Sequence, residues 1–388
     1  MKKRFACLFL ALMLAFGAAA SAESVKVGLI APLTGEVAVY GNAVKEAVQL
    51  YIDDFNAADH PFDINLIIYD DKGDPTEAMN AYNKLVYQDD IAVLLGPVTS
   101  SPTFGVAEAS VDDGIPALTP TATHPDVTTY GDNFFRACFE DPFQGGSMAK
   151  FASSELKATT AAIIYNNADT YSIGLRDAFM KTAEEVGLTV TTTEAYGASD
   201  IDFRAQLTNI IKTNPDVLFI PYYYNVTYMI CSQARELGYT GTFLGVDGTD
   251  GVLAIEGADV SVFDGMYFAN HYSADSDSPV TQAFIKEYTD KYGATPNALA
   301  ALGYDGAMIV CDALERVNND GVKIDGESSY EAIIEALRAT EVDGVTGHIT
   351  FDENNNPIKT LSIIQIKDGK IQSNEVNANK VSPMELVL

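Results

Sequence analysis

The sequence has few of the residues that build metal centres or basic surfaces. It contains no tryptophan, and its four histidines are scattered along 388 residues, so a histidine-built metal site or a bound cofactor is not expected. Lysine and arginine number 24 against 54 aspartates and glutamates, which gives a formal net charge of −30. A chain without a basic stripe cannot displace the counterions of a nucleic acid, so we expect no nucleic-acid partner.

Long apolar runs are also scarce, and the one that stands out lies at the N-terminus. A cationic segment at residues 2–4 precedes an apolar run over residues 5–16, and Ala20-Ser21-Ala22 follows. This three-part pattern is typical of an export signal that is cleaved before Glu23. The run is too short to span a bilayer comfortably, and no later stretch approaches roughly 18 consecutive apolar residues. We therefore expect residues 1–22 to be a signal peptide and the mature protein to be periplasmic, without insertion into a membrane.

Three cysteines remain after the expected cleavage site, namely Cys138, Cys231 and Cys311. An odd number in an oxidising compartment allows at most one disulfide. Because all three lie in apolar segments, we expect buried free thiols.

Short β-rich runs alternate with helical patterns along most of the chain, and helix 41–58 places its apolar residues on one face. Near-continuous apolar strands that alternate with helices are typical of parallel sheets covered on both faces. The predicted strands are 25–33, 64–70, 91–96 and 116–119 in a first series, and 160–165, 188–194, 216–221 and 242–246 in a second. The other predicted helices are 75–88, 101–112, 174–186, 203–212, 226–237, 279–292, 297–318 and 328–340, before a terminal β pair at 348–351 and 361–367.

Two series of strands predict two sheets, and therefore an α/β protein of two lobes joined by several crossings. The helical region after residue 270 has too few strands for a third domain, so we expect it to pack back onto the first lobe. The expected first lobe comprises residues 23–141 and about 271–347, and the second comprises 142–270 and about 348–388.

Ligands of parallel sheets bind at the carboxyl ends of the strands, and hydroxyl-bearing residues follow two predicted strands of the first lobe. Ser100 begins a Ser-Ser-Pro helix start, where free N–H groups and the helix dipole favour an anion such as a carboxylate. Thr121 and Thr123 follow the next strand. A structural cap and an ordinary turn are the alternative interpretations.

In the second lobe, an acidic residue and tyrosines occupy the corresponding strand ends. Asp247 follows one predicted strand, Tyr223 ends another, and Tyr171 precedes a helix. An Asp-Gly turn and packing tyrosines would explain each residue separately. Hydroxyls at a helix start that face a carboxylate and tyrosines would suit a small zwitterion.

Motifs for catalysis are mostly missing: no dinucleotide-binding glycine motif, P-loop, nucleophile elbow or zinc-protease motif occurs. Ser147-Met148-Ala149-Lys150 matches a serine-acylase pattern, but its partner motifs are absent and the segment is predicted to be a helix interior. Residues 352–356 favour a hairpin turn over a calcium loop, because the expected glycine is Pro357. We therefore expect a protein that is not an enzyme, with no catalytic residues.

An ordered series of short motifs extends over essentially the whole mature chain. It includes Val27–Gly35, Tyr40-Gly41, Gly96-Pro97 with Ser100, Thr119–Pro125, and Arg136 with Asp141 and Gln144. This series resembles the branched-chain amino-acid-binding family, the type I periplasmic solute-binding proteins of ABC importers. The resemblance implies two Rossmann-like lobes, three hinge crossovers and a ligand cleft between the lobes.

The resemblance also assigns roles to particular residues of the first lobe. Ser100 and Thr123 match hydroxyls that bind the α-carboxylate of the ligand. The backbone around Thr121 and Ala122 is expected to assist them, and Tyr40 matches an aromatic residue on the rim of this lobe.

In the second lobe, Asp247 matches the acidic residue that binds the α-ammonium group, and Tyr171 and Tyr223 match aromatic walls. The expected function is capture of an α-amino acid, of the aliphatic or branched-chain type, by closure of the lobes. A monomer would then deliver the ligand to a membrane permease. Two alternatives remain: a sensor of the same fold for small amides or carboxylates, and an exported hydrolase that uses Ser147.

Overall fold

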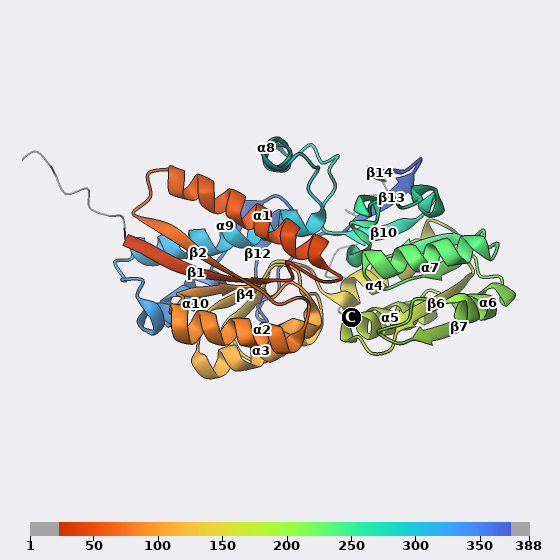
Figure 1. Cartoon of the computed structure of the whole chain (residues 1–388), viewed down its shortest axis with the longest axis horizontal. Coiled ribbons are helices and arrows are strands. Elements are labelled where there is room, and N and C mark those ends of the chain that lie inside the picture. Colours follow the sequence, from red (N-terminus) through yellow and green to blue (C-terminus); the bar gives the residue numbers. More distant parts are fainter. Residues whose placement is uncertain (1–22, 374–388) are drawn as a thin grey trace, which may run out of the picture.

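The computed structural model describes residues 23–373, which form two lobes that lie side by side along the long axis (Figure 1). The first lobe is built on a parallel five-stranded sheet of order β2-β1-β3-β4-β5. The strands are β1 (Glu23–Ala31), β2 (Phe62–Asp70), β3 (Val93–Leu95), β4 (Ala117–Thr119) and β5 (Phe134–Arg136). Helices α1 (Ala38–Ala57) and α9 (Ala298–Asn319) cover one face, and α2 (Pro75–Lys84) and α3 (Ser100–Asp113) cover the other.

The second lobe is built on a seven-stranded sheet of order β14-β13-β10-β9-β8-β6-β7, in which β13 and β14 are antiparallel to their neighbours. Its strands are β6 (Thr160–Asn166), β7 (Thr189–Tyr196), β8 (Val217–Phe219), β9 (Thr242–Gly245), β10 (Tyr267–Asn270), β13 (Ser362–Lys367) and β14 (Lys370–Ser373). Helices α4 (Asp141–Ser154) and α5 (Thr170–Glu185) cover one face, and α6 (Arg204–Lys212) and α7 (Tyr224–Glu236) cover the other. The predicted class of two α/β lobes with parallel sheets is confirmed.

The late helices return to the first lobe, as the sequence predicts. Helices α8 (Pro279–Tyr292) and α10 (Tyr330–Arg338) flank α9, which lies along α1. A Cβ atom at Gly303 of α9 would lie 3.0 Å from the backbone of Val44, so the glycine allows the two helices to approach closely.

The chain passes between the lobes at three places: after β5, after β10, and before β13. The precise lobe boundaries stay a prediction, but contacts near residue 350 favour a later third crossing. The Phe351 ring lies 5.2 Å from that of Phe135, and Asn355 Nδ2 donates to the carbonyl of Phe134 at 3.2 Å. Residues 351–356 therefore pack on the first lobe.

Strands are present at both segments of the predicted terminal β pair, but they do not pair with each other. Strand β12 (Gly347–Thr350) pairs with β11 (Glu341–Gly344), whereas β13 pairs with β10 and β14. Strand β11 escapes prediction because its sequence, Glu-Val-Asp-Gly, has little β propensity. The hairpin turn at 352–356 is confirmed, since Asp352 Oδ1 accepts the N–H groups of Asn354 and Asn356 at 2.8 and 2.9 Å.

Cys138, Cys231 and Cys311 are buried free thiols, as predicted. Within residues 23–373, no helix combines the length and the apolar composition needed to cross a bilayer. The predicted signal peptide lies outside the described residues.

Candidate functional site

Seven of the eight predicted site residues surround one small cavity between the lobes. The cavity has a volume of about 20 Å³, which is room for about one water molecule. Its walls are Tyr40, Val98, Thr99, Ser100, Thr121, Thr123, Tyr171, Tyr223, Asp247, Gly248 and Leu299. The predicted residue outside this set is Ala122, which is fully buried beside it. The sequence therefore identified residues from both lobes that meet in three dimensions.

The first-lobe wall is the N-terminus of α3, which begins at Ser100, one residue before the predicted start, with Thr99 as its N-cap residue. The first N–H groups of a helix have no acceptor within the helix, and they carry its positive dipole end. Ser100 Oγ accepts the N–H of His124 at 3.3 Å, so its own hydroxyl hydrogen remains available to an anion. Thr103 Oγ1 donates to the carbonyl of Thr99 and strengthens this first turn. The arrangement can bind a carboxylate.

The Thr121 loop has a bracing role in this conformation. Thr121 Oγ1 donates to the carbonyl of Val98 at 2.5 Å, and the N–H of Ala122 donates to Thr119 Oγ1 at 3.1 Å. These donors are therefore occupied, and they tie the loop to the segment before α3. Thr123 differs, because its backbone carbonyl accepts the N–H of Asp141, at the start of α4, at 2.9 Å.

Arg136 fixes the loop that carries Thr121 and Thr123, a role that was not predicted from the sequence. The side chain is fully buried and donates to the carbonyls of Ala122, His124 and Pro125 at 3.2, 2.9 and 2.9 Å. Three carbonyls fixed by one rigid guanidinium define the path of the loop that carries Thr121 and Thr123. The sequence signal for Arg136 was its place in the ordered motif series, together with Asp141 and Gln144.

Asp247 forms the opposite, acidic wall of the cavity. It is 6% exposed, and its Oδ1 accepts the Tyr171 hydroxyl at 2.5 Å and the N–H of Gly248 at 2.9 Å. Burial alone would raise the pKa of Asp247, but hydrogen bonds from His271, Tyr171 and Gln144 hold it below its usual value. The side chain is therefore a carboxylate at neutral pH and can pair with a cation.

His271 completes the partners of Asp247, and sequence reasoning also missed it. Its Nε2 lies 3.0 Å from Asp247 Oδ2, and its ring stacks on Phe139 at 3.7 Å. Burial lowers the pKa of His271 despite the neighbouring carboxylate, so the ring is neutral at pH 7 and donates through Nε2–H. His271 Nδ1 is buried without a hydrogen-bond partner within the described chain.

A second buried acid, Asp141, lies at the start of α4. Gln144 connects the two acids: its Nε2 donates to Asp141 Oδ1 at 3.1 Å, and its Oε1 accepts the N–H of Asp247 at 3.1 Å. Burial raises the pKa of Asp141 well above its usual value, and the charge of Asp247 adds to this effect. The pKa values of the two neighbouring acids are therefore shifted in opposite directions, upwards for Asp141 and downwards for Asp247.

Tyrosines close the cavity. The rings of Tyr171 and Tyr223 stack at 5.0 Å, and the Tyr40 ring meets Tyr223 edge-on at 5.7 Å. The Tyr40 hydroxyl bridges the lobes, because it donates to the carbonyl of Gly248 and accepts the N–H of Tyr224 at 3.1 Å. A second bridge runs from the Tyr224 hydroxyl to the carbonyl of Glu36 at 3.0 Å. The hydroxyl groups of Tyr40 and Tyr224 therefore join the two lobes beside the cavity.

The serine of the acylase-like motif lies away from this cavity. Ser147 is inside α4, 2% exposed, and its Oγ is a buried atom without a hydrogen-bond partner in the described residues. A nucleophilic serine is activated by a base within hydrogen-bond reach, and no such hydrogen bond to Ser147 Oγ occurs in the described residues. No group of three or more potential metal ligands occurs within residues 23–373.

Comparison with known proteins gives consistent matches over the whole described chain. A family model described as "Periplasmic binding protein" matches residues 24–370. A leucine-, isoleucine-, valine-, threonine- and alanine-binding protein of Pseudomonas aeruginosa is 30% identical over 90% of this chain and 92% of its own. The Leu/Ile/Val-binding protein BraC3 of Rhizobium johnstonii is 31% identical, over 93% of this chain and 96% of its own.

Solved structures show the same architecture. The leucine binding protein LivK of Thermotoga maritima has a TM-score of 0.84 and 32% identity, covering 93% of this chain and 99% of that one. LivJ of Streptococcus pneumoniae, solved with isoleucine, has a TM-score of 0.83 and 29% identity, with 90% and 98% covered. The chain therefore belongs to the periplasmic binding protein family, whose two-lobed fold it shares. The relatives named here are binding proteins rather than enzymes.

Proposed function

We propose that the protein is the substrate-binding component of an ABC importer and that it captures a branched-chain α-amino acid between its lobes. The observation that carries this proposal is the single cavity in which a helix N-terminus with Ser100 faces the ionised Asp247. The two walls are complementary to the two charges of an α-amino acid. The names of the relatives, which include isoleucine- and leucine-binding proteins, support the aliphatic class.

In this mechanism the α-carboxylate accepts hydrogen bonds from Ser100 and the first N–H groups of α3. The α-ammonium donates to Asp247, which lies away from water where charge-assisted hydrogen bonds are strong. Because the cavity holds about one water in the closed arrangement, the lobes must part before an amino acid can bind. Closure around the ligand then presents both lobes in one fixed arrangement to a membrane permease.

Export to the periplasm and a monomeric state complete the proposal. The motif at residues 1–22 and the family support export. The proposal depends on the opposite charges of the two walls of the cavity. It does not depend on the precise lobe boundaries or on the roles of the individual tyrosines.

The test uses residues 23–388, refolded to remove any carried ligand, and measures binding calorimetrically. Leucine, isoleucine and valine should bind, and ligand at a hundredfold over Kd should stabilise the protein by about 2.7 kcal/mol. Two truncated analogues of leucine separate the walls: 4-methylpentanoate lacks the ammonium group, and 3-methylbutylamine lacks the carboxylate. Both should bind far more weakly than leucine.

An Asp247→Ala variant should lose about 2–5 kcal/mol of binding, because the ligand ammonium is left buried and unpaired. Asp277→Ala, at an exposed aspartate, is the matched control and should bind normally. Normal amino-acid binding by Asp247→Ala would contradict the proposal. Tight binding of 4-methylpentanoate alone would instead indicate a carboxylate-binding protein.

A further inference from the structure

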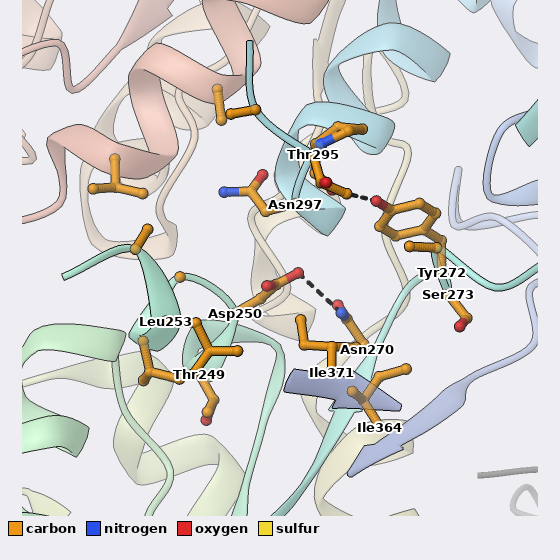
Figure 2. A pocket seen from close by; sticks show the side chains of 18 of the residues that line it. Thr249, Asp250, Leu253, Asn270, Tyr272, Ser273, Thr295, Asn297, Ile364 and Ile371 are labelled. Atoms are coloured by element: carbon orange, nitrogen blue, oxygen red, sulfur yellow. Dashed lines mark hydrogen bonds between the residues drawn. The ribbon is translucent and has the colours of Figure 1, made fainter. Parts of the chain in front are cut away.

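A much larger pocket lies between the lobes and shares no lining residue with the cleft cavity. Its volume is about 560 Å³, against about 20 Å³ for the cleft. The first lobe contributes Val39, Ala43 and residues 294–297, and the crossing after β10 contributes residues 272–275. The second lobe contributes residues 249–254 and side chains of β10, β13 and β14 (Figure 2). This volume falls in the range of pockets that bind small molecules.

The walls of this pocket are largely apolar. Figure 2 shows Leu253, Ile364 and Ile371 around the lower part of the space, on the side of the second lobe. Val39 and Ala43 of α1 line it from the first lobe. Such walls favour a ligand with a hydrocarbon body.

One buried carboxylate lies at the centre of the apolar walls. Asp250 is 5% exposed, and its Oδ2 accepts Asn270 Nδ2 at 3.0 Å (Figure 2). The same oxygen accepts the N–H of Ala298 at 2.8 Å. A carboxylate accepts about four hydrogen bonds, so Asp250 has capacity for a further donor beside these two. Burial raises the pKa of Asp250, so its ionised form would gain from a cationic partner.

The other charged groups in the lining are mostly acidic. Glu46 and Asp275 are further acids in its lining, and the one lysine among the lining residues is the exposed Lys370. Glu46 accepts the Tyr288 hydroxyl at 2.7 Å, so a neutral donor rather than a cation holds it. The buried Asp250 and the Glu46 carboxylate, against one exposed lysine, favour a positively charged ligand.

We propose that this pocket is a second ligand site, which takes a small amphipathic cation: a primary ammonium group on an alkyl or aryl body. The ammonium donates to Asp250, and the hydrocarbon body packs on Leu253, Ile364 and Ile371. Its ligand lacks the carboxylate that the cleft requires.

The two sites are joined through short segments of chain. Gly248 lines the cleft, and the next residue, Thr249, lines the second pocket. Likewise, Tyr40 lines the cleft, and the residue before it, Val39, lines the second pocket. Because both lobes form the second pocket, a ligand there favours the closed arrangement. This coupling rests on the proposed function. A bound ammonium compound should raise the affinity of the cleft for the amino acid, and a bound amino acid should raise the affinity of the second pocket for the ammonium compound by the same factor.

The test uses 2-phenylethylammonium as the probe and measures its Kd calorimetrically at pH 7.5. The neutral analogue 2-phenylethanol should bind at least fivefold more weakly. Ala254 lines the pocket at an exposed position, so Ala254→Trp should fill the space without disturbing the core and weaken the probe at least tenfold. Ala198→Trp, at an exposed alanine of the second lobe outside the lining, is the matched control and should bind the probe normally.

Asp247→Ala separates this proposal from the proposed function. Probe binding within threefold of the parent in Asp247→Ala supports a second site, whether or not any amino acid binds the cleft. Loss of probe binding in Asp247→Ala, or unchanged binding in Ala254→Trp, would overturn the proposal by placing the probe elsewhere. Absence of probe binding to the parent protein would overturn it as well.

Discussion

At the scale of single residues, the cleft depends on a carboxylate whose two oxygens have different partners. Tyr171 and the N–H of Gly248 hold Asp247 Oδ1, whereas His271 contacts Oδ2. Hydrogen bonds to the charged form keep Asp247 ionised in a buried place where desolvation would otherwise protonate it. His271 therefore acts as a positioning residue, and its own protonation would place a positive charge where the ligand ammonium must bind.

This arrangement predicts a pH dependence of amino-acid affinity. Burial lowers the pKa of His271 below its ordinary value of about 6.5, so the ring is neutral at pH 7 and becomes charged only as the pH falls through that lowered pKa. Affinity should be constant above pH 7 and should decline once the pH approaches the lowered pKa. His271→Gln keeps a donor for Asp247 but cannot be protonated, so its affinity should stay nearly flat over this interval. Calorimetry from pH 8 to 5 measures both profiles, and parallel profiles would show that His271 has no such role.

A functional residue could be predicted when the sequence next to it carried the signal, and not when its role arises from a contact with a distant residue. Ser100 and Asp247 could be found because each follows a predicted strand, and parallel strands carry their ligands at that end. His271 and Gln144 could not, since their roles arise from contacts with Asp247, which lies 24 and 103 positions away. Ala122 was expected to assist a ligand, but the structure bonds its N–H to Thr119.

At the scale of elements, the loop between β3 and α3 places the helix N-terminus in the cleft. Gly96 opens this loop with φ of +98°, and a Cβ atom there would lie 2.2 Å from the carbonyl oxygen of Ile30. Any side chain at this position must move either β1 or the loop. The position of Ser100 therefore depends on a glycine four residues earlier.

Gly96→Ala should destabilise the protein by about 1–3 kcal/mol for the backbone strain alone, with a further loss from the clash. Gly114 is a matched control, because it also has a positive φ (+65°) but no atom within 4 Å of its Cβ position. Urea unfolding should show a clearly larger loss for Gly96→Ala than for Gly114→Ala. Amino-acid affinity should fall in Gly96→Ala alone, because only that change moves the start of α3. Equal losses in the two variants would contradict the argument.

Helices and strands were predicted correctly where the sequence carries signals for both the start and the end of the element. Helix α8 has the predicted bounds, because Ser278 and Pro279 mark its start and Gly293 its end. Strand β5 has three fully buried residues, too few to show a period, and it was missed. The pairing of β13 with β10 joins segments about a hundred residues apart, which no local pattern can reveal.

At the scale of the whole molecule, a buried ion pair fixes two of the three crossings between the lobes. Lys359, on the third crossing, donates to the carbonyl of Ala137 on the first at 2.7 Å and to the Thr346 hydroxyl. Its Nζ lies 4.0 Å from Asp305 of α9, which also accepts the N–H groups of Val345 and Thr346. Burial raises the pKa of Asp305 and lowers that of Lys359, so each needs the other to remain charged.

Removing one partner should therefore cost more than removing both. Lys359→Met leaves a buried carboxylate uncompensated and should destabilise the protein by about 3–5 kcal/mol, whereas adding Asp305→Asn should recover part of this loss. A double-mutant cycle by urea unfolding at pH 7.5 measures the coupling, which should exceed about 1 kcal/mol. Because the pair joins the crossings rather than the cleft walls, the double variant should keep the amino-acid selectivity of the parent while changing its rate of closure. Additive losses would show that the two side chains do not act together, and the hinge would then depend on Thr346 and the backbone carbonyls instead.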